Sequence, residues 1–352
     1  MASYKIKKSE RHDYAGFGQK VYRKLHKTFY RVLGSREKAY PFYRSYRHRK
    51  KKPVGKESVE QYMTEEPAYL AGFGHGLGAW RAGLLCAEAF GLSYAYSPMV
   101  NESWDRTLGL GDGIPSVKEL VRVGYRKVRL PYYRMESAES RELIAEIIAS
   151  YEGKKAIFCN EYEQWAAGSE NIKGDEIIRK MFWASSARKN DKLLYDKEEV
   201  SIALHIRRGD VNSRRQQGDT SMQMRWLELS YYTAVMKTIL DVKREDQTIR
   251  FYVFSEGEEA DFEELRIPGA EITYCLGMSA EESFLHICHA DMVVAAPSSF
   301  SIEAGAINKN LKIVPDKEWL TYPKTSEWLT LPEDGYIDEN SAKAIREALS
   351  RE

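Results

Sequence analysis

The second half of this 352-residue sequence alternates short apolar stretches with amphipathic ones, and this alternation constrains the fold more than any other feature. Stretches that predict strands begin at Ser201, Ile249, Glu271, Asp291 and Leu311, and the segments between them have the periodicity or turn chemistry of helices. Strands that are separated by helices pack as a parallel sheet with right-handed crossovers. We therefore predict an α/β fold with a parallel-sheet domain over residues 200–352.

Residues 61–199 predict a first α/β domain. Its expected elements are, in order, a strand over 68–73 (AYLAGF), a turn over 74–78 (GHGLG), a helix over 79–91, a strand over 92–98, a helix over 140–151, a strand over 155–160 and a helix over 175–187. The glycine turn superficially suggests a dinucleotide fingerprint. Its glycines alternate instead of following the G-x-G-x-x-G spacing, and the second strand does not end in an acidic residue, so we set a dinucleotide oxidoreductase aside.

The segment before these domains, residues 1–60, has a charge of its own. The whole chain carries a net charge of +1, yet residues 1–57 hold 18 Lys and Arg against 4 Asp and Glu, a net charge of +14 that leaves −13 for the remainder. Val21, Leu25 and Phe29 recur at helical spacing beside a basic face, so we expect a basic amphipathic helix. Such an asymmetry suggests an extension with its own partner.

Two partners fit the basic residues 20–52 equally well. One is an anionic membrane surface or anionic glycan, because each basic residue near such a surface contributes about 1 kcal/mol. The other is the acidic body of the same protein. No nucleic-acid motif accompanies the charge, so we expect no nucleic-acid partner.

Composition limits the remaining classes. The chain is 43% hydrophobic and long enough for two globular domains, but it has no apolar run of membrane-spanning length, and its first residues lack the apolar core of a secretory signal. We expect a cytoplasmic protein, peripheral to a membrane if the basic segment binds one. The four cysteines never fall in a C-x-x-C spacing, so neither a zinc site nor a disulfide framework is indicated.

Polar residues follow three of the predicted strands of the second domain. His205, Arg207, Arg208 and Asp210 follow the first, Ser255 and Glu256 follow the second, and Ser298 and Ser299 follow the fourth. Ligands of parallel sheets bind outside the carboxyl ends of the strands. The three clusters are therefore expected to line one crevice.

These residues have the chemistry of a nucleoside diphosphate site. An arginine fork can hold two phosphate oxygens, and a helix that begins at Ser298 and Ser299 presents free N–H groups to an anion. The carboxylate of Glu256 could accept hydrogen bonds from N1 and N2 of guanine. Each signal also has a purely structural interpretation: Arg208 can pair with Asp210, and the serines can form an ordinary helix cap.

The motif HIRRGD, the Tyr-Tyr pair of LSYYTAVM, YVFSE and HICHADMVVAAPSSFSIEAGAI together resemble GDP-fucose-dependent fucosyltransferases of the α1,2 and α1,6 type, which carry an HxRRxD motif. The resemblance covers residues 201–315, and the segment GFGHGLGAWRAGLLCAEAFGLSYAYS is similar more loosely. It implies a GT-B glycosyltransferase with two facing Rossmann-like domains. The implied reaction is inverting transfer of L-fucose from GDP-β-L-fucose to a glycan hydroxyl in α1,6 or α1,2 linkage.

The resemblance also implies site residues. Arg207 would hold the β-phosphate, and the other donor-binding residues would be His205, Arg208, Glu256, Ser298, Ser299, Ser301 and Gly76. Asp210, His75 and Glu102 are candidates for the general base, and the sequence does not choose among them. The predicted catalytic residues are Arg207, Asp210 and His75. No Asp-x-Asp motif is present, so we expect no metal and no cofactor beyond the donor substrate.

Two departures limit the resemblance. Ile302, Glu303 and Ala304 stand where many α1,2 enzymes have a tryptophan-rich helix start, and Ala79 and Trp80 stand where the related loop has an Asn-Gln pair. The first departure weakens the prediction of an α1,2 linkage. The second weakens the prediction of acceptor contacts in this loop. Two alternatives therefore stay open: a GT-B transferase with another nucleotide sugar, and a non-catalytic glycan or membrane adaptor with a degenerate nucleotide site.

Overall fold

The computed structural model describes residues 25, 28, 59–65, 73–99, 102–131, 133–160, 172–209, 211–212, 218, 220–317 and 321–350. The chain divides into two compact units, residues 1–168 with 184–186 and residues 169–183 with 187–352. The amphipathic helix expected near the amino terminus lies outside the described residues, apart from residues 25 and 28.

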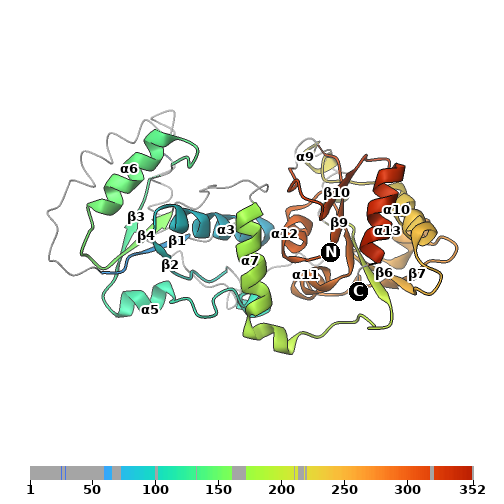
Figure 1. Ribbon diagram of the computed structural model, residues 1–352, viewed down its shortest axis with the longest axis horizontal. Helices are drawn as coiled ribbons and strands as arrows, with labels where there is room; N and C mark the ends of the chain where they lie inside the picture. The colour runs from blue at the N-terminus through green and yellow to red at the C-terminus, as the bar shows by residue number, and fades with distance from the viewer. Residues whose placement is uncertain are drawn as a thin grey trace. The chain divides into compact units, whose positions relative to one another are not determined.

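The first unit contains a four-stranded parallel sheet in the order β2-β1-β4-β3 (Figure 1). Its described elements are β1 (Tyr62–Glu65), α3 (Phe73–Ala89), β2 (Ser93–Tyr94), α4 (Glu102–Leu108), α5 (Val117–Arg122), β3 (Arg126–Arg129), α6 (Ala138–Ala149) and β4 (Ala156–Asn160). The helix expected over 140–151 and the strand expected over 155–160 are thus confirmed, whereas the strand expected over 92–98 is confirmed only at Ser93–Tyr94.

The beginning of this unit differs from the prediction. The strand is β1, whereas the expected strand over 68–73 lies outside the described residues except for Phe73, which opens α3. The expected turn over 74–78 is wrong, because these residues form the first turns of that helix. Buried Leu77 and Trp80 pack α3 into the core, and this packing outweighs the low helix propensity of glycine. Gly83 adds close contact, since a Cβ there would lie 2.7 Å from Cβ of Glu65.

The second unit contains a six-stranded parallel sheet in the order β10-β9-β8-β5-β6-β7. Its described elements are α7 (Ile172–Ala184), the 3₁₀ helix η3 (Ser186–Asn190), β5 (Val200–His205), α9 (Thr220–Gln223), α10 (Leu229–Val242), β6 (Ile249–Phe254), the 3₁₀ helix η4 (Glu259–Leu265), β7 (Glu271–Tyr274), α11 (Ala280–His289), β8 (Met292–Val294), α12 (Ser299–Ile307), β9 (Leu311–Pro315), β10 (Trp328–Leu331) and α13 (Glu339–Leu349). The parallel sheet expected from the alternating pattern is confirmed.

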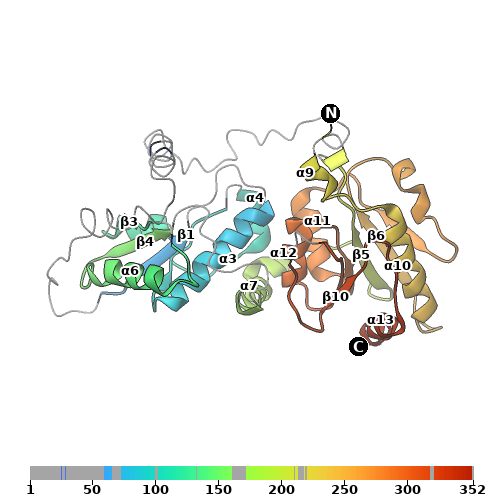
Figure 2. The same ribbon diagram turned by 90° about the horizontal axis from the view of Figure 1, so that it is seen from above.

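Helices cover both faces of this sheet: α11 and α12 lie on one face, and α10 and α13 lie on the other (Figures 1 and 2). Under the second face, Leu204 and Val253 of the strands pack with Tyr232 and Met236 of α10 and Ile345 of α13, all of them buried. This apolar core fixes the strands, and the strand ends in turn fix the polar residues that follow them.

Helix α7 packs against α12 within the second unit. The Nε atom of Arg179 donates a hydrogen bond to the carbonyl oxygen of Ala306 at 2.9 Å, and Nε1 of Trp183 donates to that of Ile307 at 3.0 Å. These carbonyl groups belong to the last turn of α12, where helical carbonyls lack partners inside the helix. Although α7 precedes the predicted domain boundary at residue 200, its contacts therefore place it in the second unit.

Candidate functional site

The strand order of the second unit fixes where a ligand would bind. Counted from β5, the order is 3-2-1-4-5-6, which is the order of doubly wound dinucleotide-binding folds. After β5 the chain adds β6 and β7 on one side and then continues with β8 on the other side of β5. β5 and β8 are neighbours, and Leu204 pairs with Val294. Ligands of such sheets bind outside the carboxyl ends of the strands at this switch point.

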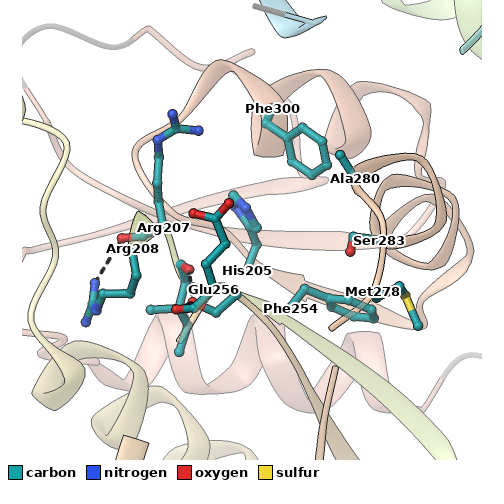
Figure 3. A pocket seen from close by; sticks show the side chains of 11 residues that line it. His205, Arg207, Arg208, Phe254, Glu256, Met278, Ala280, Ser283 and Phe300 are labelled. Atoms are coloured by element: carbon teal, nitrogen blue, oxygen red, sulfur yellow. Dashed lines mark hydrogen bonds between the residues drawn. The ribbon is translucent and has the colours of Figure 1, made fainter. Parts of the chain in front are cut away.

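A pocket lies at this position (Figure 3). It holds about 640 Å³, a volume that includes open solvent at its mouth. Its lining residues are His205, Ile206, Arg207, Arg208, Phe254, Ser255, Glu256, Met278, Ala280, Ser283 and Phe300. The structure thus brings together four predicted site residues from two strand ends.

Arg207 connects the end of β5 with the start of α12. Its Nη1 atom lies 3.4 Å from Oγ of Ser298, which is the N-cap residue of α12 and accepts a hydrogen bond from the backbone N–H of Phe300 at 3.3 Å. A guanidinium group and the amino end of a nine-residue helix therefore lie next to each other. Both features favour a bound anion.

Arg208 points in the opposite direction from Arg207 (Figure 3). Its guanidinium carbon lies 3.9 Å above the ring of Trp226, and its Nη1 atom donates to the carbonyl oxygen of Arg207 at 3.1 Å. The residue is only 8% exposed. These contacts give Arg208 a supporting place beside the Arg207 backbone, and its predicted contact with a donor stays a prediction.

His205 is the last residue of β5, and two residues of α12 contact its ring. Its Nδ1 atom forms a short hydrogen bond with Oγ of Ser301, and Phe300 lies beside the ring with centroids 5.1 Å apart. Burial, together with the positive charge of Arg207, lowers the pKa of His205 to about 3. The imidazole is therefore neutral near pH 7. Ser301 is fully buried and supports the histidine from outside the pocket lining.

The neutral state of His205 predicts a pH-dependent stability. An unfolded histidine takes up a proton as pH falls through about 6.5, whereas folded His205 takes it up only near pH 3. The unfolded state then binds more protons, so the free energy of unfolding should fall by about 1.4 kcal/mol per pH unit between these values. Urea denaturation of wild type and His205→Gln should show this slope in their difference, which cancels the contributions of other histidines. Equal slopes would contradict a buried neutral His205.

The remaining predicted residues lie in different places. Glu256 lines the pocket, and Ser299 is an exposed residue in the first turn of α12. Gly76 and the backbone of His75 lie in α3 of the first unit, while Glu102 is the exposed first residue of α4. Asp210 lies outside the described residues. The roles predicted for all of these residues stay predictions.

One side of the pocket was not predicted from the sequence. Phe254, Met278, Ala280, Ser283 and Phe300 form it, opposite the arginines (Figure 3). Three of these residues lie in or just before the first turn of α11, directly after β7. The strand-end rule could have included them, but their side chains lack the charge that singled out the other residues.

Within the described part of the chain, no cluster of three or more His, Cys, Asp or Glu side chains could hold a metal ion. A search of the described helices found none that combines the length and apolar character needed to cross a bilayer.

Comparison with solved structures found similarity to fucosyltransferases. The chain is similar to the NodZ α-1,6-fucosyltransferase soaked with GDP-fucose (13% identity, 72% of this chain and 93% of that chain, TM-score 0.39). It is similar to fucosyltransferase NodZ from Bradyrhizobium (14%, 71% and 93%, TM-score 0.39) and to POFUT1 in its apo form (13%, 72% and 96%, TM-score 0.45). These TM-scores describe a distant likeness. No family model and no curated protein sequence matches the chain.

Proposed function

We propose that this protein is an inverting glycosyltransferase of GT-B architecture that transfers L-fucose from GDP-β-L-fucose to a glycan hydroxyl in α1,6 or α1,2 linkage. The observation that carries the proposal is the approach of Arg207 to Ser298 at the amino end of α12, at the switch point of the sheet. The resemblance of residues 201–315 to fucosyltransferase motifs supports the choice of donor. We further propose a cytoplasmic location and contact of residues 20–52 with an anionic membrane surface.

The reaction needs stabilisation of a leaving diphosphate. The acceptor oxygen attacks the anomeric carbon, the bond from that carbon to the β-phosphate oxygen breaks, and its electron pair stays on GDP. Arg207 and the N–H groups of α12 would stabilise the charge that develops there, which is electrostatic catalysis by groups already in place. Neutral His205 can add one hydrogen bond without a charge. The proton of the acceptor hydroxyl would pass to Asp210, His75 or Glu102.

Nucleotide binding tests the first part of this proposal. The midpoint temperature of thermal unfolding should rise with GDP and remain unchanged with UDP or NAD⁺, because ligands that bind only the folded state stabilise it. A response to UDP would favour another nucleotide sugar. No response to any of the three would favour a non-catalytic adaptor. Incubation with GDP-fucose and a glycan panel, followed by detection of GDP and of fucosylated product, tests the transfer itself.

Metal independence is a further part of the proposal. If Arg207 and α12 supply the positive charge at the diphosphate, activity should stay unchanged after treatment with EDTA. Loss of activity in EDTA that Mn²⁺ or Mg²⁺ restores would contradict this part and leave the choice of donor standing.

A further inference from the structure

The loop that carries Arg207 is fixed by the neighbouring strand end. The backbone N–H of Ile206 donates to the carbonyl oxygen of Phe254 at 3.0 Å, and the hydroxyl of Ser255 donates to the carbonyl oxygen of Ile206 at 2.6 Å. Both contacts join the end of β5 to the end of β6, immediately before Arg207. On the other side of Arg207 the chain turns through Gly209, and the backbone N–H of Val211 donates to the carbonyl oxygen of Arg208 at 2.9 Å.

Glu256, which follows β6, lies against the chain on that other side. Gly209 has a φ of +37°, in the region where side chains are unfavourable, and a Cβ built on it would overlap Oε2 of Glu256 and lie 3.2 Å from Oε1. The carboxylate therefore fills the space that a side chain at residue 209 would take. The two residues that follow β6, Ser255 and Glu256, thus contact the chain before and after Arg207.

We infer that Glu256 is a positioning residue for Arg207, which holds the loop so that the guanidinium group reaches the amino end of α12. This inference rests on the proposed function and deepens it. Glu256 is an exposed residue whose carboxylate lies against Gly209, so its loss should disturb the diphosphate clamp whatever base the nucleotide carries. If the carboxylate instead selected guanine, removing it would weaken the binding of GDP alone.

Calorimetric titration with GDP and with inorganic pyrophosphate separates the two roles. For Glu256→Ala we expect both ligands to bind more weakly by a similar factor, roughly 10-fold, the change that 1.4 kcal/mol produces. Glu256→Gln, which keeps the shape of the side chain, should restore most of the affinity for both. Weakened GDP binding with unchanged pyrophosphate binding would overturn the inference and leave the proposed function intact. If the wild-type protein binds neither ligand, the proposed function itself fails.

Gly209→Ala tests the contact from its other side. The added Cβ should push the carboxylate away and weaken the binding of both ligands as Glu256→Ala does. The double variant should bind them no more weakly than either single variant. Additive losses would show that the residues act independently and would overturn the inference. Gly269→Ala is the matched control, since Gly269 also has a positive φ, of +81°, and a Cβ there would meet nothing within 4 Å. Circular dichroism and thermal unfolding of each variant will show whether it remains folded.

Discussion

Replacing Arg207 with alanine is expected to abolish transfer and to weaken GDP binding by about 100-fold or more. Removing a charged partner from a desolvated contact costs about 2–5 kcal/mol, and each 1.4 kcal/mol is tenfold in affinity. The charge near Ser298 would be lost, while α12 and its cap would remain. GDP titration and an assay for fucosylated product measure the two effects.

Two further variants make the Arg207 experiment specific. Arg207→Lys keeps the charge but loses the planar fork, so binding should fall between that of the wild type and that of the alanine variant. Arg266→Ala removes an arginine whose side chain is 52% exposed in the same unit, and it should leave GDP binding unchanged. Normal turnover by Arg207→Ala would show that the diphosphate clamp has been assigned to the wrong residue.

The second large effect is expected on stability, at Glu327. Its carboxylate accepts hydrogen bonds from Nη1 and Nη2 of Arg179 at 3.1 and 2.7 Å and from Nζ of Lys312 at 2.9 Å. The Lys312 side chain is fully buried, and burial lowers its pKa to about 8 even though Glu327 raises it. The ammonium group therefore depends on this carboxylate to remain charged inside the protein.

Glu327→Gln should lower the free energy of unfolding by about 3 kcal/mol, because removal of one partner leaves a buried charge uncompensated. Lys312→Met is the informative partner variant, since it removes the buried charge and keeps an apolar stem near Trp328. In the Lys312→Met background, Glu327→Gln should cost clearly less, as measured by urea denaturation at pH 7. Equal costs in both backgrounds would show that Lys312 does not depend on Glu327.

The sequence predicted the second unit well because its strands are regular. Apolar stretches that start at Ser201, Ile249 and Leu311 became β5, β6 and β9, with starts within one residue of the prediction. Turn residues bound each stretch, so the apolar pattern and the turn residues indicate the same strand. β10 was not predicted, because its four residues, Trp328–Leu331, are too short and too mixed in polarity to show a period.

The first unit was harder to predict for a related reason. In β1, buried Thr64 and Glu65 break the apolar pattern of a central strand. The glycines before Trp80 favoured a turn, while the packing of α3 that makes them helical involves residues distant in sequence. Local propensity gives way to such contacts, which a single sequence does not reveal.

Sequence could also predict which residues gather at the site, but not how each one is used. The rule of strand ends brought His205, Arg207 and Glu256 to one pocket. It could not show that Ser301 lies behind His205, or that a carboxylate fills the space beside Gly209. Both contacts depend on side-chain direction across elements that are far apart in sequence.

The contact of α7 with the last turn of α12 determines where the chain can be cut. A fragment that begins at residue 200 would lose Arg179 and Trp183 and leave the carbonyl groups of Ala306 and Ile307 without their donors. Each such loss costs about 1–3 kcal/mol when the group stays buried. An independently expressed nucleotide-binding half should therefore start ahead of Ile172, and limited proteolysis of the intact chain should release a stable piece that retains α7.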